Sequence, residues 1–255
     1  MLLVFNWKTY LSAHEGLHLA ESLARFSSTK LAGSGITCVI APPTVMISNI
    51  YNTVAGSGIK VAAQDCSIFP CGANTGENSV ENIWQHGCQY VLTGHSERRK
   101  NNGETNEIIS QKSTMVCKAN MIPIVCVGEK KVQNLKDASK SVIKQLEESA
   151  PKITEKFTHN HFIVAYEPVW AIGTNKSPTP EHISTIASAI EDRFPTDPEI
   201  PLEKPLILYG GSVNHGNCKE ILSTKGIEGL LIGRAGLIYD EAVKILSAAL
   251  QLQKK

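Results

Sequence analysis

Eight short apolar runs, separated by stretches with helical spacing, constrain most strongly what this chain can fold into. Each run is too short for a buried helix, and its length matches a strand that is covered on both faces. Such runs are typical of a parallel sheet. The predicted strands are Leu2–Phe5, Ile36–Ala41, Ile59–Ala63, Tyr90–Leu92, Ile122–Val127, Phe162–Tyr166, Leu206–Tyr209 and Gly229–Ile232.

Helical spacing between and after these runs predicts a helix behind each strand. Strands that alternate with helices indicate βαβ units. Eight units can close into a barrel, whereas a doubly wound sheet usually has fewer strands and leaves its edges open. The predicted fold class is therefore α/β, a (β/α)8 barrel of eight parallel strands with an outer ring of helices. The predicted helices are Ala13–Phe26, Thr44–Ala55, Ser79–His86, Thr105–Ala119, Asn134–Glu148, Pro180–Phe194, Cys218–Leu222 and Asp240–Leu252.

Composition and length narrow the setting in which such a barrel works. The chain has 255 residues and no linker rich in Gly, Ser or Pro, so residues 1–255 are expected to form a single domain. A net charge of +1 gives no basic surface for nucleic acid or membrane. The 7 cysteines are odd in number and lack a C-x-x-C pair, which disfavours a zinc ribbon or a disulfide framework. We therefore expect a cytoplasmic protein with no nucleic-acid or membrane partner.

Polar residues and glycines gather directly after six of the eight predicted strands. In a parallel barrel the carboxyl ends of all strands open at one face, where the chemistry of such folds takes place. This coincidence predicts an active site at that face. The segments are Asn6-Trp7-Lys8, Gly94–Arg99, Gly128-Glu129, Glu167–Thr174, Gly210-Gly211-Ser212 and Gly233-Arg234.

The segment that begins at Glu167 is the most informative of the six. A carboxylate at the end of a buried strand is partly removed from water, where a glutamate can become a proton acceptor. The stiff Pro168, the apolar residues after it and the flexible Gly173 are typical of a lid that closes over a site. For Glu167 taken alone, an exposed acid followed by an ordinary loop remains an equally good interpretation.

Three further side chains suit the same chemistry. His95 precedes a predicted helix start at Ser96, and helix N–H groups disfavour a protonated imidazole, so His95 is expected to be a neutral donor. Lys8 could stabilise developing negative charge, with Asn6 as a neutral donor beside it. A loop-capping histidine and a solvent-exposed lysine are the alternatives. Glu97 is expected to support the site by pairing with a cation such as Lys8.

Glycine-rich loops complete the candidate site. At Gly173, Gly210-Gly211-Ser212 and Gly233 the backbone can approach a ligand closely, and its N–H groups can hold a phosphate. Each glycine alone is compatible with an ordinary turn. A base, a neutral donor, a cation, a phosphate site and a lid together predict proton abstraction beside a carbonyl, with a stabilised enediolate. The sequence carries no metal or cofactor motif, so neither a metal nor a cofactor is expected.

Four segments of this chain closely resemble the triosephosphate isomerase family, and the resemblance spans essentially the whole sequence in matching order and spacing. The segments are Asn6-Trp7-Lys8, Gly94–Arg99, Ala165–Thr174 and Tyr209–Val213. The resemblance implies a TIM barrel that interconverts dihydroxyacetone phosphate and glyceraldehyde 3-phosphate. It also implies that no cofactor or metal takes part.

The resemblance further implies a role for each site residue. Glu167 would move the proton between the two carbons, His95 would act at the oxygens, and Lys8 would stabilise the enediolate together with Asn6. The phosphate would be held at Gly173, Ser212, Gly233 and the Arg234 N–H. Supporting positions behind these groups are Glu97, Cys126, Tyr209, Gln64 and Glu104, with Cys126 expected in the core.

A homodimer is also implied, in which Thr75 on the loop 69–76 reaches into the partner. The lid of this chain departs from the family at Pro178, because proline has no N–H to bond Tyr209 when the lid closes. We therefore expect that bond to be absent, while Ser212 reaches an N–H near Asn175. The competing interpretations are a different phosphate-binding barrel enzyme and a catalytically inactive phosphate-binding barrel that acts as a binding protein.

Overall fold

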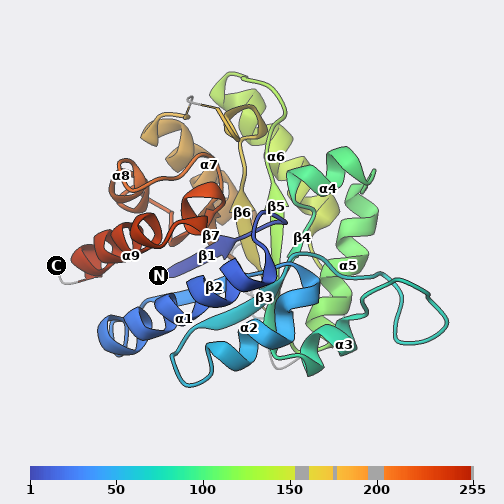
Figure 1. The fold of residues 1–255 in the computed structure, drawn as a ribbon. Coiled ribbons are helices and arrows are strands. Elements are labelled where there is room, and N and C mark those ends of the chain that lie inside the picture. Colours follow the sequence, from blue (N-terminus) through green and yellow to red (C-terminus); the bar gives the residue numbers. More distant parts are fainter. Residues whose placement is uncertain (153–160, 175–176, 195–203, 254–255) are drawn as a thin grey trace.

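The computed structural model describes residues 1–152, 161–174, 177–194 and 204–253. At its centre eight strands form a closed barrel, in which each strand pairs in parallel with the next and β1 pairs with β8 (Figure 1). The predicted fold class, a (β/α)8 barrel, is confirmed. The strands are β1 (Leu2–Asn6), β2 (Thr37–Ala41), β3 (Lys60–Ala63), β4 (Cys88–Thr93), β5 (Ile122–Val127), β6 (Ile163–Tyr166), β7 (Leu206–Tyr209) and β8 (Gly229–Ile232).

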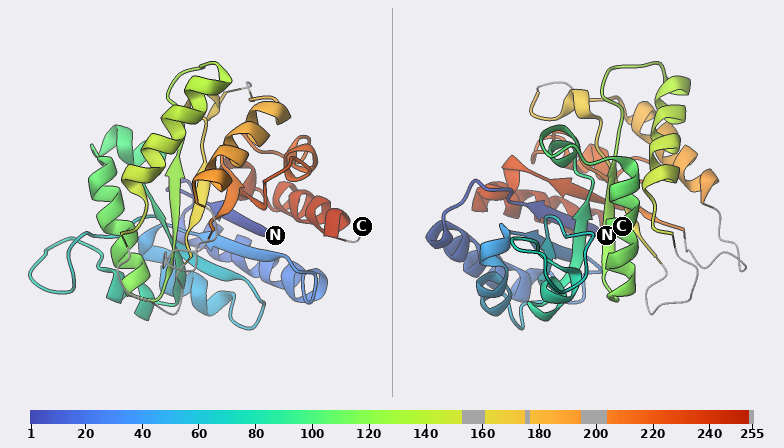
Figure 2. Two further views of the ribbon diagram at one scale, coloured as in Figure 1. Left: turned by 180° about the vertical axis from the view of Figure 1, so that it is seen from behind. Right: turned by 90° about the vertical axis from the view of Figure 1, so that its right-hand side faces the viewer.

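Helices surround the barrel on all the sides seen in three views (Figures 1 and 2). Short 3-10 helices lie in three connections: η1 (Thr44–Met46), η2 (Val169–Ala171) and η3 (Arg234–Leu237). The α-helices are α1 (Ala13–Lys30), α2 (Ile47–Thr53), α3 (Val80–Gln85), α4 (Ser96–Asn101), α5 (Asn106–Lys118), α6 (Leu135–Ser149), α7 (Pro180–Arg193), α8 (Cys218–Leu222) and α9 (Tyr239–Gln253).

The clearest differences from the predicted bounds are at α1 and β4. Helix α1 continues to Lys30 instead of ending at Phe26, because the buried Ser27 hydroxyl donates to the Ser57 carbonyl at 2.8 Å. A polar contact to a distant segment leaves no apolar periodicity in the sequence. The predicted strand Tyr90–Leu92 covers only the middle of β4, because the exposed Gln89 interrupts the apolar pattern.

Two apolar layers hold the barrel together. Side chains that point inward fill its interior, and a larger set packs between the strands and the helices, where Phe5 and Trp7 are fully buried. This is the alternation expected of strands covered on both faces. The interior residues are Leu2, Val4, Val39, Ala41, Ala62, Leu92, Ile124, Cys126, Ile163, Ala165, Leu208 and Leu231.

The same alternation carries functional residues to the mouth of the barrel. Asn6 follows Leu2 and Val4 at two-residue steps, and Glu167 follows Ile163 and Ala165 in the same way. Successive side chains of a strand point to opposite faces, so both polar residues continue the inward-facing rows. The inward-facing rows of β7 and β8 end in the same way, at Gly210 after Leu208 and at Gly233 after Leu231. The strand pattern itself thus gathers the candidate site.

One connection projects away from the barrel. The segment 64–79 between β3 and α3 extends as a long loop at the side of the molecule (Figures 1 and 2). Its base is closed by a hydrogen bond from the Ser67 N–H to the Asn78 carbonyl at 2.9 Å. Phe69 on this loop is 48% exposed, so a large apolar side chain is presented to the surroundings. Among the described helices, none is long and apolar enough to cross a membrane.

Candidate active site

Glu167 lies at the carboxyl end of β6 and is only 2% exposed. Its Oε2 accepts a hydrogen bond from the Ser96 N–H at 3.1 Å, and its Oε1 lies 3.1 Å from His95 Nε2. Burial acts to raise the pKa of Glu167, but His95, the Ser96 N–H and Lys8 together outweigh it, so the pKa is lowered. The carboxylate is therefore ionised at neutral pH.

The His95 ring lies between a donor and an acceptor that assign its tautomer. The N–H of Glu97, in the first turn of α4, points at Nδ1 over 3.3 Å, so Nδ1 is the acceptor and Nε2 carries the proton toward Glu167. Burial acts to lower the pKa of His95, but the charge and hydrogen bond of Glu167 outweigh burial, so the pKa is raised. If Glu167 turns away, that upward influence is lost. The Glu97 N–H then favours the neutral imidazole of His95, with Nε2–H as the donor.

Lys8 has a backbone conformation that is unusual for a residue with a side chain, with φ at 50°. Its N–H donates to Asn6 Oδ1 at 3.0 Å, and its carbonyl accepts from Gln64 Nε2 at 2.8 Å. Its ammonium lies 2.6 Å from Glu97 Oε1. These contacts fix both the backbone and the charge of Lys8 at the mouth. Strain held in this way is typical of functional positions.

A cavity of about 380 Å³ brings the predicted residues together. The Lys8 side chain, the Glu167 side chain and the glycine-rich turns that follow β7 and β8 line this cavity. One bound molecule can therefore place a negatively charged group and a reacting carbon in the same space. The predicted residues that line it are Asn6, Lys8, His95, Glu97, Glu167, Gly173, Ser212, Gly233 and Arg234.

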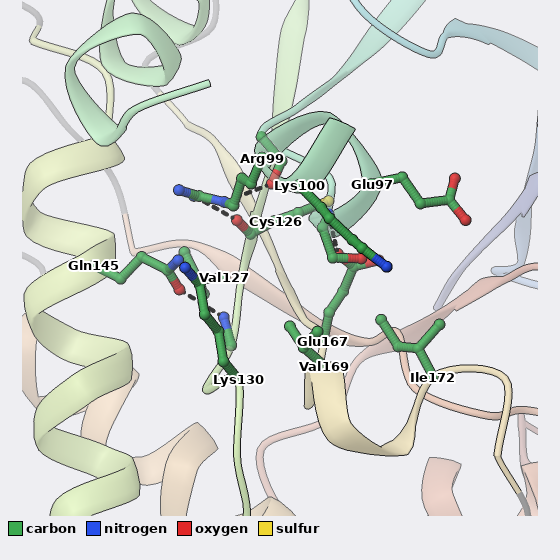
Figure 3. Close-up of a pocket in the computed structure, with 13 residues that line it drawn as sticks. Glu97, Arg99, Lys100, Cys126, Val127, Lys130, Gln145, Glu167, Val169 and Ile172 are labelled. Carbon is green, nitrogen blue, oxygen red and sulfur yellow. Dashed lines mark hydrogen bonds between the residues drawn. The ribbon is translucent and has the colours of Figure 1, made fainter. Parts of the chain in front are cut away.

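A second cavity, also of about 380 Å³, lies on the other side of the Glu167 side chain. Figure 3 shows Glu167 at its centre, with Ile172 and Glu97 to one side and Gln145 and Lys130 to the other. Glu97, Glu167 and Ile172 line both cavities. The carboxylate and the lid residue Ile172 thus have open space on two sides, which gives them room to move.

The lid segment, residues 168–174, is tied to the barrel by a few hydrogen bonds. The Ser212 hydroxyl lies 2.7 Å from the Ala171 carbonyl and 3.1 Å from the Thr174 carbonyl. At the first hinge, Trp170 Nε1 donates to Glu129 Oε1 at 2.7 Å. A segment held mainly through side chains can change position by exchanging these bonds.

Two glycines make room for Glu167. A Cβ atom at Gly128 would lie 1.8 Å from the Glu167 carbonyl oxygen, and one at Gly210 would lie 2.9 Å from its Cγ. The first distance is a direct clash with backbone, and the second is tighter than an ordinary van der Waals contact. Both positions therefore require glycine if Glu167 is to stay where it is.

Comparison with known proteins identifies the family. A family model described as triosephosphate isomerase matches residues 1–249. The chain belongs to the triosephosphate isomerase family. It is 35% identical to the triosephosphate isomerase of Klebsiella pneumoniae over 249 residues, which cover 97% of this chain and 96% of that protein. It is also 35% identical to that of Rhodopirellula baltica over 254 residues, covering 98% of this chain and 97% of that protein.

A solved structure gives the same result. The crystal structure of triosephosphate isomerase from Bartonella henselae matches with a TM-score of 0.81 and 27% sequence identity. The match covers 97% of this chain and 98% of that chain. The fold and the sequence thus point to one family across nearly the full length of this isomerase.

Residues predicted to support the site of this isomerase lie behind Glu167 and His95. Cys126 lies in the barrel interior, and burial followed by the nearby Glu167 carboxylate raises the pKa of its thiol. The Arg99 guanidinium donates to the Cys126 carbonyl at 2.9 Å and to the Gly94 carbonyl at 2.7 Å. Arg99 thereby joins the start of α4 to β5. Tyr209 is fully buried and contacts the Tyr166 ring edge-on.

Asp65 belongs to a four-charge cluster beneath α4. Lys112 Nζ lies 2.7 Å from Asp65 and 2.6 Å from Glu104, while Arg98 contacts the same two acids at 2.7 Å and 2.9 Å. Two positive and two negative charges therefore balance. Because Arg98 is part of α4, the cluster also fixes the helix that presents His95 and Ser96 to the site.

The second hinge of the lid lies partly outside the described residues. Asn175 is among those not described, so the contact expected there between Ser212 and an N–H is not tested. Pro178 is buried, and so is the Tyr209 hydroxyl, which has no hydrogen-bond partner of normal geometry within the described part of the chain. The absence of a bond from this hinge to Tyr209 in a closed lid stays a prediction.

Three groups at the site are not assigned a role by the sequence. The Ser96 N–H is a backbone group, which no side-chain pattern reveals. Glu129 follows the fifth strand, but its contacts with Tyr166 and Trp170 become visible only in three dimensions. His182 lies in a predicted helix, and its position in the first turn after Pro180 is the only signal that could place it near the lid.

Proposed function

We propose that Glu167 is the base with which this triosephosphate isomerase interconverts dihydroxyacetone phosphate and D-glyceraldehyde 3-phosphate. The observation that supports this role is the contact between the ionised, buried carboxylate of Glu167 and the Nε2–H of His95 at 3.1 Å. Both groups line the cavity that contains the Lys8 ammonium. A base, an acid and a cation thus converge on one small space.

The proposed reaction begins with the substrate phosphate bound near Gly173, Ser212, Gly233 and the Arg234 N–H. Glu167 removes a proton from the carbon beside the carbonyl, and the electrons move to the carbonyl oxygen. His95 donates a hydrogen bond from Nε2 to that oxygen, and Lys8 with Asn6 offsets the developing charge. His95 then gives its Nε2 proton to that oxygen and takes the proton of the neighbouring hydroxyl in return, while Glu167 returns its proton to the carbon that bore the carbonyl, so that the neighbouring oxygen becomes the new carbonyl. Two protons thus change places, one between the carbons and one between the oxygens, and Glu167 and His95 end in their starting forms.

Loss of the resting contacts of Glu167 favours proton removal. Hydrogen bonds from Ser96 and His95 stabilise the carboxylate and lower its pKa. When Glu167 moves toward the substrate it gives up these two hydrogen bonds, while the apolar lid residues Val169 and Ile172 close over it, so the charged carboxylate is less stable than at rest. Its basicity therefore rises at the moment when it is needed. Closure of the same apolar residues excludes water from the enediolate and so protects it from loss of phosphate.

The test is isomerase activity of the purified protein on glyceraldehyde 3-phosphate, with Glu167→Asp measured beside the wild type. Shortening the side chain by one methylene withdraws the carboxylate while keeping its charge, so the reacting geometry is lost. We expect kcat to fall at least about tenfold, or about 1.4 kcal/mol of barrier. The same change at the exposed helix residue Glu21 is the control and is expected to have no effect. An unaffected Glu167→Asp enzyme would exclude this residue as the base.

We also propose a homodimer in which the loop 69–76 of each copy enters the other. The projection of this loop and the exposure of Phe69 support the proposal, because an apolar side chain on a protruding loop suits a partner surface. Thr75, which is exposed near the tip, is the proposed contact with the partner site. Light scattering should give twice the chain mass for the wild type and a smaller species for Thr75→Arg. A fully active monomeric wild type would contradict the proposal.

We further propose that residues 1–255 act as one barrel domain in the cytoplasm, which cell fractionation would test. The alternative function, an inactive phosphate-binding barrel, has no specific observation in its favour. Asn6, Lys8, His95 and Glu167 all line the site, and the matched relatives bear the name of the enzyme.

A further inference from the structure

His182, in the first turn of α7, packs against the first hinge of the lid. Its ring stacks on Tyr166, with centroids 6.5 Å apart and planes 10° apart. It meets the Trp170 ring edge-on, at 6.4 Å and 71°. Its Nε2 lies 3.6 Å from Glu129 Oε1, just beyond hydrogen-bond range. A histidine therefore touches both the lid tryptophan and the acid that holds that tryptophan.

Both members of this His–Glu pair have an unpaired polar atom. His182 Nε2 and Glu129 Oε2 are buried and have no hydrogen-bond partner among the residues that the structure describes. The other carboxylate oxygen, Oε1, accepts from both the Tyr166 hydroxyl at 3.0 Å and Trp170 Nε1 at 2.7 Å. Buried polar groups are nearly always paired, and an unpaired one destabilises the fold. A small displacement would bring His182 Nε2 from 3.6 Å to within hydrogen-bond range of Oε1, the oxygen that Trp170 uses.

We propose that His182 is a positioning residue of the lid, which binds Glu129 when protonated and thereby weakens the hold of Glu129 on Trp170. With neutral His182, Glu129 Oε1 remains available to Trp170 and the hinge stays in the described position. With protonated His182, the buried carboxylate gains a charged donor that competes for the same oxygen. The inference rests on the proposed function of residues 168–174 as the lid over Glu167.

The titratable groups that face His182 from the neighbouring elements are a carboxylate and a phenol, with a second phenol beside the first. Glu129 faces it from the connection after β5, Tyr166 from β6, and Tyr209 contacts Tyr166 from β7. Burial and the Glu129 carboxylate raise the pKa of Tyr166, and burial raises that of Tyr209, so both phenols stay protonated. Trp170 does not titrate. Histidine is the side chain whose charge ordinarily changes between about pH 5 and pH 8.

The inference has a direct spectroscopic consequence. The indole N–H of Trp170 reports its hydrogen bond to Glu129, so its NMR signal should shift as His182 gains a proton. In protein labelled with ¹⁵N-tryptophan, Trp7, Trp84 and Trp170 give the three indole signals, and Trp170→Phe identifies the relevant one. We expect the Trp170 signal of the wild type to shift when the pH is lowered from about 8 to about 5.5.

Two variants test the source of that shift. His182→Gln keeps a polar side chain that cannot gain charge, so the Trp170 signal should no longer titrate. Glu129→Gln removes the partner charge and should have the same effect, which keeps the test available if one variant does not fold. His215→Gln is the matched control, because His215 also pairs with an acid, Glu241 at 2.7 Å, but in an exposed position. The Trp170 signal of His215→Gln should change with pH as it does in the wild type.

Kinetics supply a second readout. If protonation frees the lid for closure, the KM of the wild type divided by that of His182→Gln should fall about threefold or more from pH 8 to about pH 5.5. Substrate ionisation affects both enzymes equally and cancels in this ratio. A Trp170 signal that does not titrate in the wild type, or that titrates equally in His182→Gln, would overturn the inference. The NMR test needs no turnover, so it fails or succeeds independently of Glu167 as base.

Discussion

Replacing Gly210 by alanine should displace the proposed base without touching any of its polar partners. The added Cβ would lie 2.9 Å from Glu167 Cγ, whereas its other contacts, with Leu231 at 3.5 Å, are ordinary. Carbon atoms in proteins rarely approach closer than about 3.4 Å, so Glu167 must move by about 0.5 Å or more. The hydrogen bonds to Ser96 and His95, both 3.1 Å long, leave little slack for that movement.

The size of the effect follows from how sharply rate depends on position. A displacement of about 1 Å in a reacting group costs on the order of 100-fold. We therefore expect Gly210→Ala to lower kcat by about 10-fold to 100-fold, equivalent to about 1.4–2.7 kcal/mol of barrier. KM should change less, because the atoms nearest to the added Cβ belong to Glu167 and Leu231, not to Lys8 or Ser212. Overpacking should also destabilise the fold by about 1–3 kcal/mol.

The assay is steady-state kinetics in both directions, together with circular dichroism to verify the fold. Gly216→Ala is the matched control, because Gly216 lies on the same connection but is exposed, and its Cβ would meet only the Asn214 side chain at 3.1 Å. The control should retain full activity. A folded Gly210→Ala enzyme with the kcat of the wild type would show that the position of Glu167 is not critical, and would refute the reasoning.

Two further predictions concern stability. Lys112→Met should lower the free energy of unfolding by about 3–5 kcal/mol, because it leaves two acids with Arg98 as their only positive partner in the cluster. Asp65→Asn should lower it by about 1 kcal/mol or less, because Asp65 is partly exposed and burial raises its pKa. Equal losses for the two variants in urea titrations would contradict this prediction. The lowered pKa of Glu167 means that its ionised form adds stability at neutral pH, which is lost as the pH falls from 4.5 through the lowered folded-state pKa. Relative to Glu167→Gln, the wild type should therefore lose stability below about pH 4.5 in unfolding measurements, and a constant difference would exclude the shift.

The barrel and its reacting end could be predicted because both follow from local pattern. Continuous apolar runs such as Ile122–Val127 indicate buried parallel strands whichever residues they contact. Two-residue alternation then places Asn6 and Glu167 inward at the ends of β1 and β6. The end of α1 could not be predicted in this way, because it depends on a hydrogen bond between Ser27 and a segment 30 residues away. Local sequence carries no trace of such a partner.

The same limit separates the predicted site residues from those without an assigned role. His95 and Lys8 stand directly after strands, so the barrel topology alone brings them to the mouth. Glu129 binds Trp170, which lies 41 residues further along the chain, and His182 lies beside Glu129 from another element. Neither residue forms a motif with its neighbours in the sequence. Their significance depends on unpaired atoms, which are a property of packing. A sequence can therefore show which residues reach a site more readily than which groups control its movement.

The site combines a rigid half and a movable half, and each is built from a different kind of interaction. The rigid half rests on charge: the cluster of Asp65, Glu104, Lys112 and Arg98 fixes α4, and α4 presents the Ser96 N–H and His95 to Glu167. The lid half rests on a few exchangeable hydrogen bonds, from Ser212 and from Trp170 to Glu129. Glu167 lies where the two halves meet. Its partners in the rigid half lower its pKa. In the proposed mechanism movement with the lid removes these partners, so the geometry that keeps Glu167 ionised at rest would also release its basicity.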